Sequence, residues 1–306
     1  KFSPDGRLLA PDGADTHVRL WDTTTWKPLS QISVSPTALA KVHRVAFSPD
    51  GQRLAAVDWS GGAAVFDIRT PTMPARVQTL LHHDQQEFGQ ILWDVAFSPD
   101  GEHLAIAGQN GVWLWRGEQR VAELTTHAAN ILLFTPDGRR VVWREQLKGR
   151  VSLCNLDTAR EEPLPKPLSV SGVMAMFGDH QLLHVAGRAE SDQSPILHLT
   201  DLRTGDSSTL NWSSVPRFLS DVLPEIGFAL TQDQSMLALN GVNFSVWDLQ
   251  SRRLQWVLPA EASPSHSFDW SPDHSQLAIS LTDGTVVVWN LPAVRRQIES
   301  LGLGWE

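Results

Sequence analysis

The sequence contains no tyrosine, and its single cysteine and its lack of a long apolar run each exclude a class of protein. With Cys154 alone, the chain forms no internal disulfide and no zinc site built from several cysteines. No stretch approaches the roughly 18 apolar residues that a membrane-spanning helix requires. The net charge of −9 has the wrong sign for binding nucleic acid or anionic membranes. Because of this charge we expect neither a nucleic-acid nor a membrane partner. A single cysteine fits a reducing compartment, so we expect a cytoplasmic protein.

The usual catalytic motifs are also missing: the sequence has no P-loop, no G-x-G-x-x-G, no H-E-x-x-H and no G-x-S-x-G. His82, His83 and Asp84 could begin a metal site, but neighbours on an extended segment point to opposite faces, so only His82 and Asp84 would converge. We interpret them as a solvated loop. Cys154 has no base at a motif-like distance and is expected to be a buried hydrophobic residue. We therefore predict no enzymatic activity, no cofactor and no metal.

What the sequence does contain is a repeated phrase, FSPDG followed by a short apolar run. Seven segments match it fully or in degenerate form, and they begin near residues 2, 47, 97, 134, 177, 230 and 270. A second marker, typically an aromatic residue followed by Asp or Asn, comes 17 to 23 residues after each start. The distance from a marker to the next start varies more, from 19 to 31 residues. One half of each unit thus has a nearly fixed length, and the other half accommodates the insertions.

The fixed half has the composition of a β-hairpin. Pro-Asp-Gly is a tight turn, because Pro presets φ, Asp bonds the backbone ahead and Gly accepts positive φ. An apolar run, a polar or glycine-rich break and an alternating segment such as HVRLWD follow. Further strands precede the turn and follow the marker, which makes four strands per unit. Units of about 40–45 residues with four strands are typical of propeller blades.

On these motifs the chain resembles the WD (Trp-Asp) repeat β-propeller family over residues 1–291. The resemblance implies an all-β, seven-bladed propeller with four antiparallel strands in each blade. Members of that family usually carry a Gly-His pair that completes a buried Ser/Thr–His–Asp–Trp network. The corresponding positions here hold other residues, so we expect that network to be largely lost: Ala38, Phe88, Thr125 and Glu261. Blade seven, with Asp283 and Trp289, keeps the most of it, and stability should rest mainly on apolar packing between blades.

The two ends of the chain carry further expectations. In the WD family the phenylalanine of FSPDG ends the innermost strand of a blade, so we expect an N-terminally truncated fragment in which blades one and seven are incomplete. An open seam would then lie between these two blades. Residues 292–306 are predicted to form a short amphipathic helical tail, because Leu291, Val294, Ile298 and Leu301 recur at helical spacing.

A similar arginine-rich tail follows propellers in large bacterial multidomain proteins, some with a serine/threonine kinase upstream. That resemblance, which covers some sixteen residues, implies a C-terminal module of such a protein. It also makes an upstream kinase domain in the same polypeptide a candidate partner.

The insertions gather on one face of the expected ring, in loops at 58–62, 82–90, 144–149, 188–195 and 211–222. Because variable loops on a rigid scaffold are where recognition usually occurs, we predict partner contacts there and at the mouth of the central channel. The candidate residues are His43, Trp59, Trp93, Arg144, Arg188, Trp212 and Arg217. The competing interpretation of the tryptophans is that they pack these loops onto the ring.

We predict a non-catalytic protein–protein interaction scaffold that binds a protein or peptide through its loop-rich face. The alternative is a propeller enzyme, or a small-molecule or metal-binding module, with its site at the channel mouth. A spacer between other domains is a third interpretation.

Overall fold

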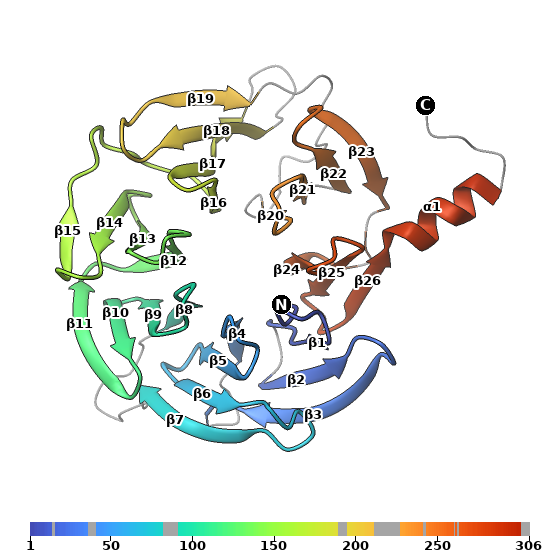
Figure 1. The fold of residues 1–306 in the computed structure, drawn as a ribbon, viewed down its shortest axis with the longest axis horizontal. Helices are drawn as coiled ribbons and strands as arrows, with labels where there is room; N and C mark the ends of the chain where they lie inside the picture. The colour runs from blue at the N-terminus through green and yellow to red at the C-terminus, as the bar shows by residue number, and fades with distance from the viewer. Residues whose placement is uncertain are drawn as a thin grey trace.

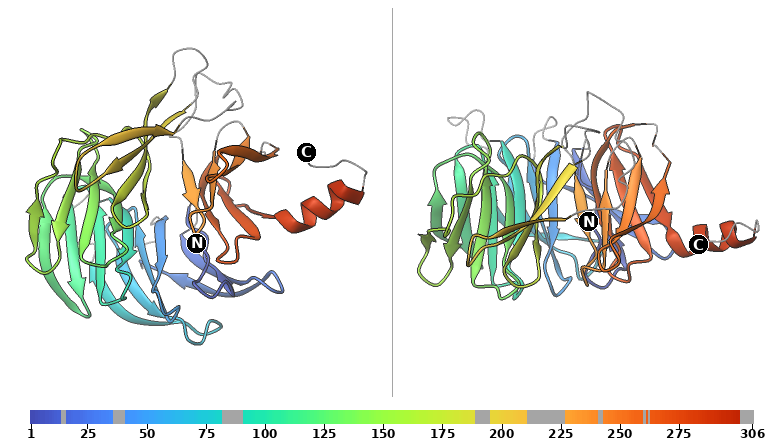
Figure 2. Two further views of the ribbon diagram at one scale, coloured as in Figure 1. Left: turned by 45° about the horizontal axis from the view of Figure 1, so that its top comes forward. Right: turned by 90° about the horizontal axis from the view of Figure 1, so that it is seen from above.

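The structure is a computed structural model of the 306-residue chain. It describes all residues except 14–15, 36–40, 82–90, 189–194, 211–226, 241–242, 260, 262 and 301–306. Seven antiparallel sheets are arranged as blades around a central axis (Figure 1), and the ring has the shape of a thick disc in side view (Figure 2). The predicted seven-bladed, all-β propeller is confirmed.

Five blades have four strands, which follow one another from the axis outward. The strands of blades two to four are β4 (Val42–Phe47), β5 (Arg53–Asp58), β6 (Ala63–Asp67), β7 (Ala75–Leu81), β8 (Leu92–Phe97), β9 (His103–Gly108), β10 (Gly111–Arg116), β11 (Gln119–Thr125), β12 (Ala129–Phe134), β13 (Arg140–Glu145), β14 (Val151–Asn155) and β15 (Arg160–Glu162). The strands of blades five and six are β16 (Met174–Phe177), β17 (Gln181–Arg188), β18 (Pro195–Asp201), β19 (Ser207–Leu210), β20 (Phe228–Leu230), β21 (Met236–Leu239), β22 (Phe244–Asp248) and β23 (Arg253–Leu258).

Blades one and seven have three strands each among the described residues, as expected for these two blades. Blade one consists of β1 (Leu8–Leu9), β2 (His17–Asp22) and β3 (Lys27–Ser33), and an isolated bridge joins Phe2 to Leu9. Blade seven consists of β24 (Ser265–Trp270), β25 (Gln276–Leu281) and β26 (Val286–Asn290). The two blades meet at a small buried core of Phe2, Leu9 and Ala278.

The recurring FSPDG phrase forms the turn between the two innermost strands of a blade. In blade two the Ser48 hydroxyl donates to the Asp50 carboxylate at 2.5 Å and accepts the backbone N–H of Arg53 at 2.9 Å. Gly51 has a φ of +69°, a conformation in which a Cβ atom would be strained. The same Ser/Thr–Asp bond recurs at Ser98–Asp100, Thr135–Asp137, Thr231–Asp233 and Ser271–Asp273. The turn role predicted for these aspartates is therefore confirmed.

Apolar layers between neighbouring blades hold the ring together. Each pair of adjacent blades encloses its own cluster of buried side chains. Trp143 lies in the cluster between blades three and four and Trp247 in the cluster between blades five and six, and both are almost fully buried. Cys154 lies in one of these layers, and burial raises the pKa of its thiol to about 11, so it is not a nucleophile at neutral pH. In blade seven, Glu261 replaces part of the missing network, because its carboxylate accepts the indole N–H of Trp289 at 3.0 Å.

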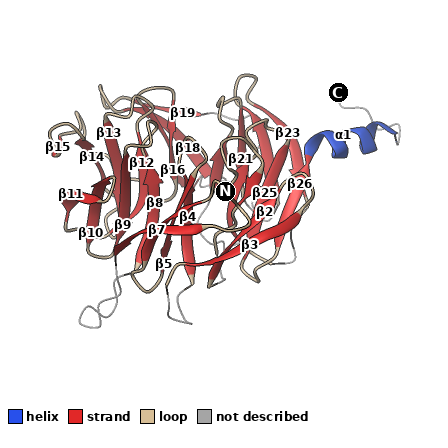
Figure 3. Ribbon diagram, turned by 60° about the horizontal axis from the view of Figure 1, so that its bottom comes forward, coloured by secondary structure: helices blue, strands red, loops and turns tan. Residues whose placement is uncertain are grey.

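The predicted C-terminal helix is present as α1 (Leu291–Ser300), coloured blue in Figure 3. The Asn290 side chain caps it by accepting the backbone N–H of Ala293 at 2.9 Å. Only Leu291 of the helix is buried. The helix extends outward from the edge of the ring (Figures 1 and 2).

Candidate functional site at the channel mouth

The innermost strands surround a central channel with a volume of about 560 Å³. Most of its lining side chains are apolar. The exceptions include Arg44 of β4, Asp94 of β8 and Asp269 of β24. These charged groups are the polar feature around which we build the site.

Arg44 lies between two carboxylates. Its guanidinium is 3.1 Å from Asp12 and 3.4 Å from Asp94, and the Asp94 carboxylate also accepts the backbone N–H of Leu132 at 2.8 Å. Burial alone would raise the pKa of the Asp12 carboxyl, but Arg44, the amino group of Lys1 and the Ser267 hydroxyl outweigh it and hold that pKa well below its usual range. At Asp94, burial outweighs Arg44 and raises the pKa. The ion pairs lock blades one, two and three together next to the axis.

An aromatic cluster lies above this ion-pair network. The imidazole of His43 is 5.2 Å from the Trp59 ring and 5.8 Å from the imidazole of His266, measured between ring centroids. The Nδ1 atom of His43 donates to the backbone carbonyl of Trp93 at 2.7 Å, since a carbonyl only accepts. The cluster thus connects blades two, three and seven just beyond Arg44, the first residue of β4 that lines the channel, and we call this region the channel mouth.

Trp59 is presented by a rigid hairpin between β5 and β6. The Asp58 carboxylate, on a fully buried residue, accepts the backbone N–H groups of Ser60 and Gly62 and the Ser60 hydroxyl, each at 2.8 Å. A side chain at position 62 would collide with that carboxylate, because a Cβ atom there would lie 2.4 Å from Oδ2. The indole of Trp59 remains 48% exposed. A large apolar ring on a fixed backbone is a typical recognition element, since little conformational entropy is lost on binding.

Burial and the neighbouring Arg44 lower the pKa of His43 to about 4, so its imidazole is neutral at pH 7. Because the folded-state pKa lies below the unfolded value of about 6.5, the contribution of His43 to stability is complete above that pH and is lost as pH falls toward 4. We expect His43→Gln to remove about 2 kcal/mol of the acid-induced loss of stability between these pH values, allowing for the partial exposure of the ring. Urea unfolding of both proteins at pH 7 and 4.5 tests this. Equal losses in the two proteins would show that His43 titrates normally.

The seven predicted contact residues divide into three groups. His43, Trp59 and the backbone of Trp93 come together, as described. Arg144 was expected in an exposed loop, and this is wrong: it lies in β13, which continues to Glu145, and it is buried with its guanidinium bonded to the Val170 carbonyl at 2.7 Å and to Asn130 at 3.0 Å. The remaining residues have side chains or whole positions outside the described part of the chain: Arg188, Trp212 and Arg217. The proposed metal-site seed at 82–84 also lies outside it.

The residues that the sequence reasoning missed are Asp12, Arg44, Asp94 and His266. For Arg44 and Asp94 a signal existed, because both stand three residues before the phenylalanine of their FSPDG phrase. Equivalent positions on the innermost strands of adjacent blades are neighbours around the axis, so opposite charges at these positions predict an ion pair. In the described residues, no group of three or more His, Cys, Asp or Glu side chains is placed to hold a metal ion.

The seven sheets, the turn chemistry and the layered cores define a β-propeller of the repeat type. Three stretches of the chain, residues 1–22, 75–116 and 253–290, match the family model described as WD domain, G-beta repeat. By this match these three stretches are WD repeats, and they lie within a seven-bladed propeller. No helix among the described residues is long and apolar enough to traverse a lipid bilayer.

Several curated proteins are similar to this chain over part of its length or over most of it. The WD repeat-containing protein VIP3 of Arabidopsis thaliana is 29% identical over 119 residues, which is 35% of this chain and 35% of that protein. The protein LST8 homolog of Drosophila melanogaster is 28% identical over 150 residues, 45% of each chain. Telomerase protein component 1 of Mus musculus is 23% identical over 95% of this chain and 12% of its own length. The chain therefore spans less than half the length of each of these relatives.

Among solved structures, hydrazine synthase of Kuenenia stuttgartiensis has a TM-score of 0.71 with this chain. The alignment covers 94% of both chains at 16% sequence identity. At that identity the likeness concerns the fold alone.

Proposed function

We propose that this chain is a non-catalytic interaction scaffold that binds a protein or peptide partner through the channel-mouth face. One observation carries the proposal: the half-exposed indole of Trp59 is held on a rigid hairpin and packed against His43. Around it, Asp12, Arg44 and Asp94 are already paired with one another. Charges that neutralise each other contribute to rigidity and are poorly suited to act as an acid or a base on a substrate.

The neutral state of His43 fits the same role. At pH 7 its ring is an uncharged, amphipathic surface beside Trp59, and its Nδ1–H is already used by the Trp93 carbonyl. Apolar side chains of a partner could therefore cover both rings without leaving a buried charge unpaired. We infer a cytoplasmic location from the single, buried and unpaired Cys154. A kinase domain in the same bacterial polypeptide remains a prediction from the resemblance of the tail.

We expect Trp59→Ala to abolish or weaken by about tenfold or more the binding of partners to this face, because a central tryptophan typically contributes 2 kcal/mol or more to an interface. The measurement is an affinity capture from the native host with quantitative mass spectrometry, followed by titration of each captured protein. Met73→Ala is the matched control, since Met73 is 78% exposed and lies between β6 and β7, on the opposite face of the disc. If every captured protein binds both variants equally well, the channel-mouth face is not the interface.

A further inference from the structure

The two faces of the disc differ in charge over blades two to four. Because the strands of a blade run alternately in opposite directions, the hairpins between second and third strands lie on the face of Trp59, and the other turns lie on the opposite face. On the Trp59 face, none of the described connecting residues at these blades is Asp or Glu: 41, 59–62, 91, 109–110, 126–128, 146–150 and 169–173. The turns of the opposite face carry six exposed acidic residues: Asp50, Asp100, Glu102, Glu118, Asp137 and Asp157. A chain with a net charge of −9 thus keeps acidic groups away from the described part of the Trp59 face at these blades.

Leu147 lies at the tip of the hairpin between β13 and β14, on this face, and its side chain is 91% exposed, more than any other large apolar side chain that the structure describes. On one side of the hairpin the N–H of Gln146 donates to the Ala128 carbonyl at 2.8 Å. On the other side the N–H of Val170 donates to the Gly149 carbonyl, also at 2.8 Å. Gly149 has a φ of +63°, and a Cβ atom there would lie 2.4 Å from the Val170 carbonyl oxygen. The tip is therefore an apolar projection on a fixed backbone.

Leu147 and Trp59 occupy the same kind of hairpin in blades four and two. The corresponding hairpin of blade three, which lies between them, consists only of Gln109 and Asn110, and both residues are exposed. The two apolar tips are thus separated by a short polar turn. A segment of a partner protein that crosses blade three can contact both tips at once.

A lysine lies beside each apolar tip. The backbone carbonyl of Lys41 accepts the N–H of Trp59 at 3.0 Å, and Lys148 follows Leu147 directly in the sequence. Both lysines are exposed, and neither forms an ion pair with a described residue. The carboxylate of Glu145, near Leu147, is only 12% exposed. The surroundings of the two tips therefore attract negative charge.

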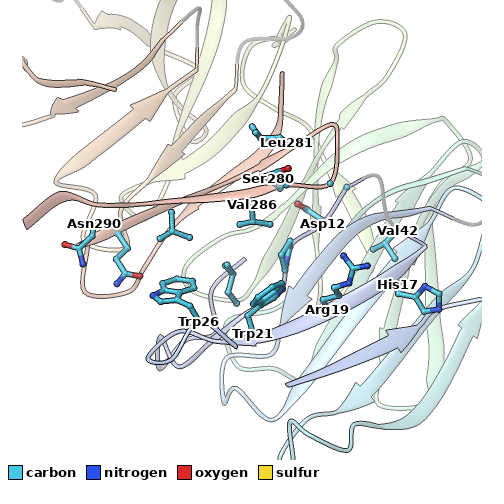
Figure 4. A pocket seen from close by; sticks show the side chains of 17 residues that line it. Asp12, His17, Arg19, Trp21, Trp26, Val42, Ser280, Leu281, Val286 and Asn290 are labelled. Atoms are coloured by element: carbon cyan, nitrogen blue, oxygen red, sulfur yellow. The ribbon is translucent and has the colours of Figure 1, made fainter. Parts of the chain in front are cut away.

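These tips are distinct from the pocket between blades one and seven. That pocket has a volume of about 570 Å³, and Figure 4 shows Asp12, Trp21 and Val286 among the side chains that line it. None of the residues at the two tips lines the pocket. The surface around the tips therefore does not depend on how blades one and seven meet.

We propose that Lys41, Trp59, Leu147 and Lys148 form one surface, the two-anchor surface, which binds an acidic, extended segment of a partner protein. One apolar side chain of the segment covers Trp59, a second covers Leu147, and carboxylates beside them pair with the two lysines. Exposed apolar side chains on a fixed backbone supply affinity because little conformational entropy is lost, and the charges around them select the partner. The inference rests on the proposed function, to which it adds a second anchor and the chemical class of the partner.

The probe is a phage library of random peptides of about 16 residues, which reach about 50 Å when extended. The library is selected on the immobilised 306-residue chain, and the enriched peptides are labelled and titrated by fluorescence anisotropy. We expect the enriched sequences to contain more Asp and Glu than the unselected library, together with several apolar residues. Their affinity should fall as the NaCl concentration rises from about 0.05 M to about 0.5 M, because salt screens exposed charges.

Leu147→Ser should weaken peptide binding about tenfold or more, because the apolar surface that the peptide covers is lost. Lys148→Glu should weaken it about threefold or more at low salt and less at high salt, because an attraction becomes a repulsion. Met73→Ser and Lys27→Glu are the matched controls, since Met73 is 78% exposed, Lys27 is the exposed first residue of β3, and both lie on the opposite face. The two control variants should bind the peptides as tightly as the parent chain does.

Equal affinity of the enriched peptides for the parent, Leu147→Ser and Lys148→Glu would overturn the inference, and a loss in Trp59→Ala alone would then leave the proposed function intact. A loss in Leu147→Ser without one in Trp59→Ala would contradict the role of Trp59 in both proposals. A library without a binder that saturates below about 1 mM, or one enriched in basic sequences, also overturns the inference. So does binding of a labelled single-stranded DNA of about 16 nucleotides that Lys148→Glu abolishes, or a dimer that Leu147→Ser abolishes, because the surface would then belong to a nucleic acid or to a second copy.

Discussion

Replacing Trp247 by alanine should lower the free energy of unfolding by about 3–5 kcal/mol, the range for removing a large aromatic side chain from a core. Trp247 is fully buried in β22, within the apolar layer between blades five and six. Its indole N–H donates to the Ser245 hydroxyl at 3.0 Å. The substitution removes buried apolar surface between two blades and leaves a cavity, and the two effects add to the loss of stability. It also leaves the buried Ser245 hydroxyl without this donor.

Urea unfolding followed by circular dichroism measures this effect. Trp59→Ala is the matched control, because the same substitution at a 48% exposed position should cost less than about 1 kcal/mol. Trp247→Phe should give an intermediate loss of about 1–3 kcal/mol, since an aromatic ring remains but the bond to Ser245 is lost. Equal unfolding midpoints for Trp247→Ala and Trp59→Ala would show that the layer between blades does not determine stability.

The number of blades and the order of strands could be predicted from sequence because each unit specifies them locally. The Ser48–Asp50–Gly51 turn involves residues within three positions of one another, so the chemistry that forms it is visible in the phrase itself. The alternating pattern of each third strand then identifies its two faces. Local signals of this kind do not depend on the rest of the chain, and among the described residues the Ser/Thr–Asp bond of the turn is present in six of the seven units.

The candidate site was predictable only in part, for a physical reason that individual residues illustrate. His43 and Trp93 could be paired because they occupy equivalent positions in adjacent blades. The position of Asp12 could not be found in this way, because Pro11 follows the two-residue second strand of blade one and no other unit has an acidic residue at the equivalent position. Its bond to Ser267 joins residues 255 positions apart in the sequence, and only the closed ring brings them together. Arg144 was misplaced because the length of β13, and not the position of its turn, decides whether that side chain is buried.

Arg44→Met should destabilise the chain at neutral pH by about 3–5 kcal/mol, the cost of removing one partner from a buried ion pair. The Asp12 side chain is 1% exposed, and Arg44 is its ion-pair partner at 3.1 Å. Methionine keeps most of the apolar stem of arginine, so the loss should come from the uncompensated carboxylate and not from packing. The double variant Arg44→Met/Asp12→Asn should recover most of the stability, because a neutral amide can be buried beside the Ser267 hydroxyl at lower cost.

The pH dependence distinguishes this explanation from a simple loss of packing. In the parent chain the folded-state pKa of Asp12 is depressed, so its contribution to stability is complete above the unfolded value of about 3.9 and is lost only as pH falls through the folded value. Without Arg44, burial is the largest remaining influence on the Asp12 carboxyl, and we expect it to bring the folded-state pKa above the unfolded value. The folded single variant then binds the extra proton, and its stability relative to the double variant increases as pH falls.

We therefore expect the difference in unfolding free energy between Arg44→Met and Arg44→Met/Asp12→Asn to be about 2–3 kcal/mol at pH 7 and to shrink toward zero at pH 4.5. Both proteins lack Arg44, so its effect on the pKa of His43 cancels in the comparison. A difference that stays constant with pH would mean that the Asp12 carboxylate is not the buried charge that Arg44 stabilises. If instead the difference disappears on acidification, the cost of removing Arg44 comes from the buried Asp12 charge, and the ion pair that joins blade one to blade two stabilises the ring by neutralising that charge.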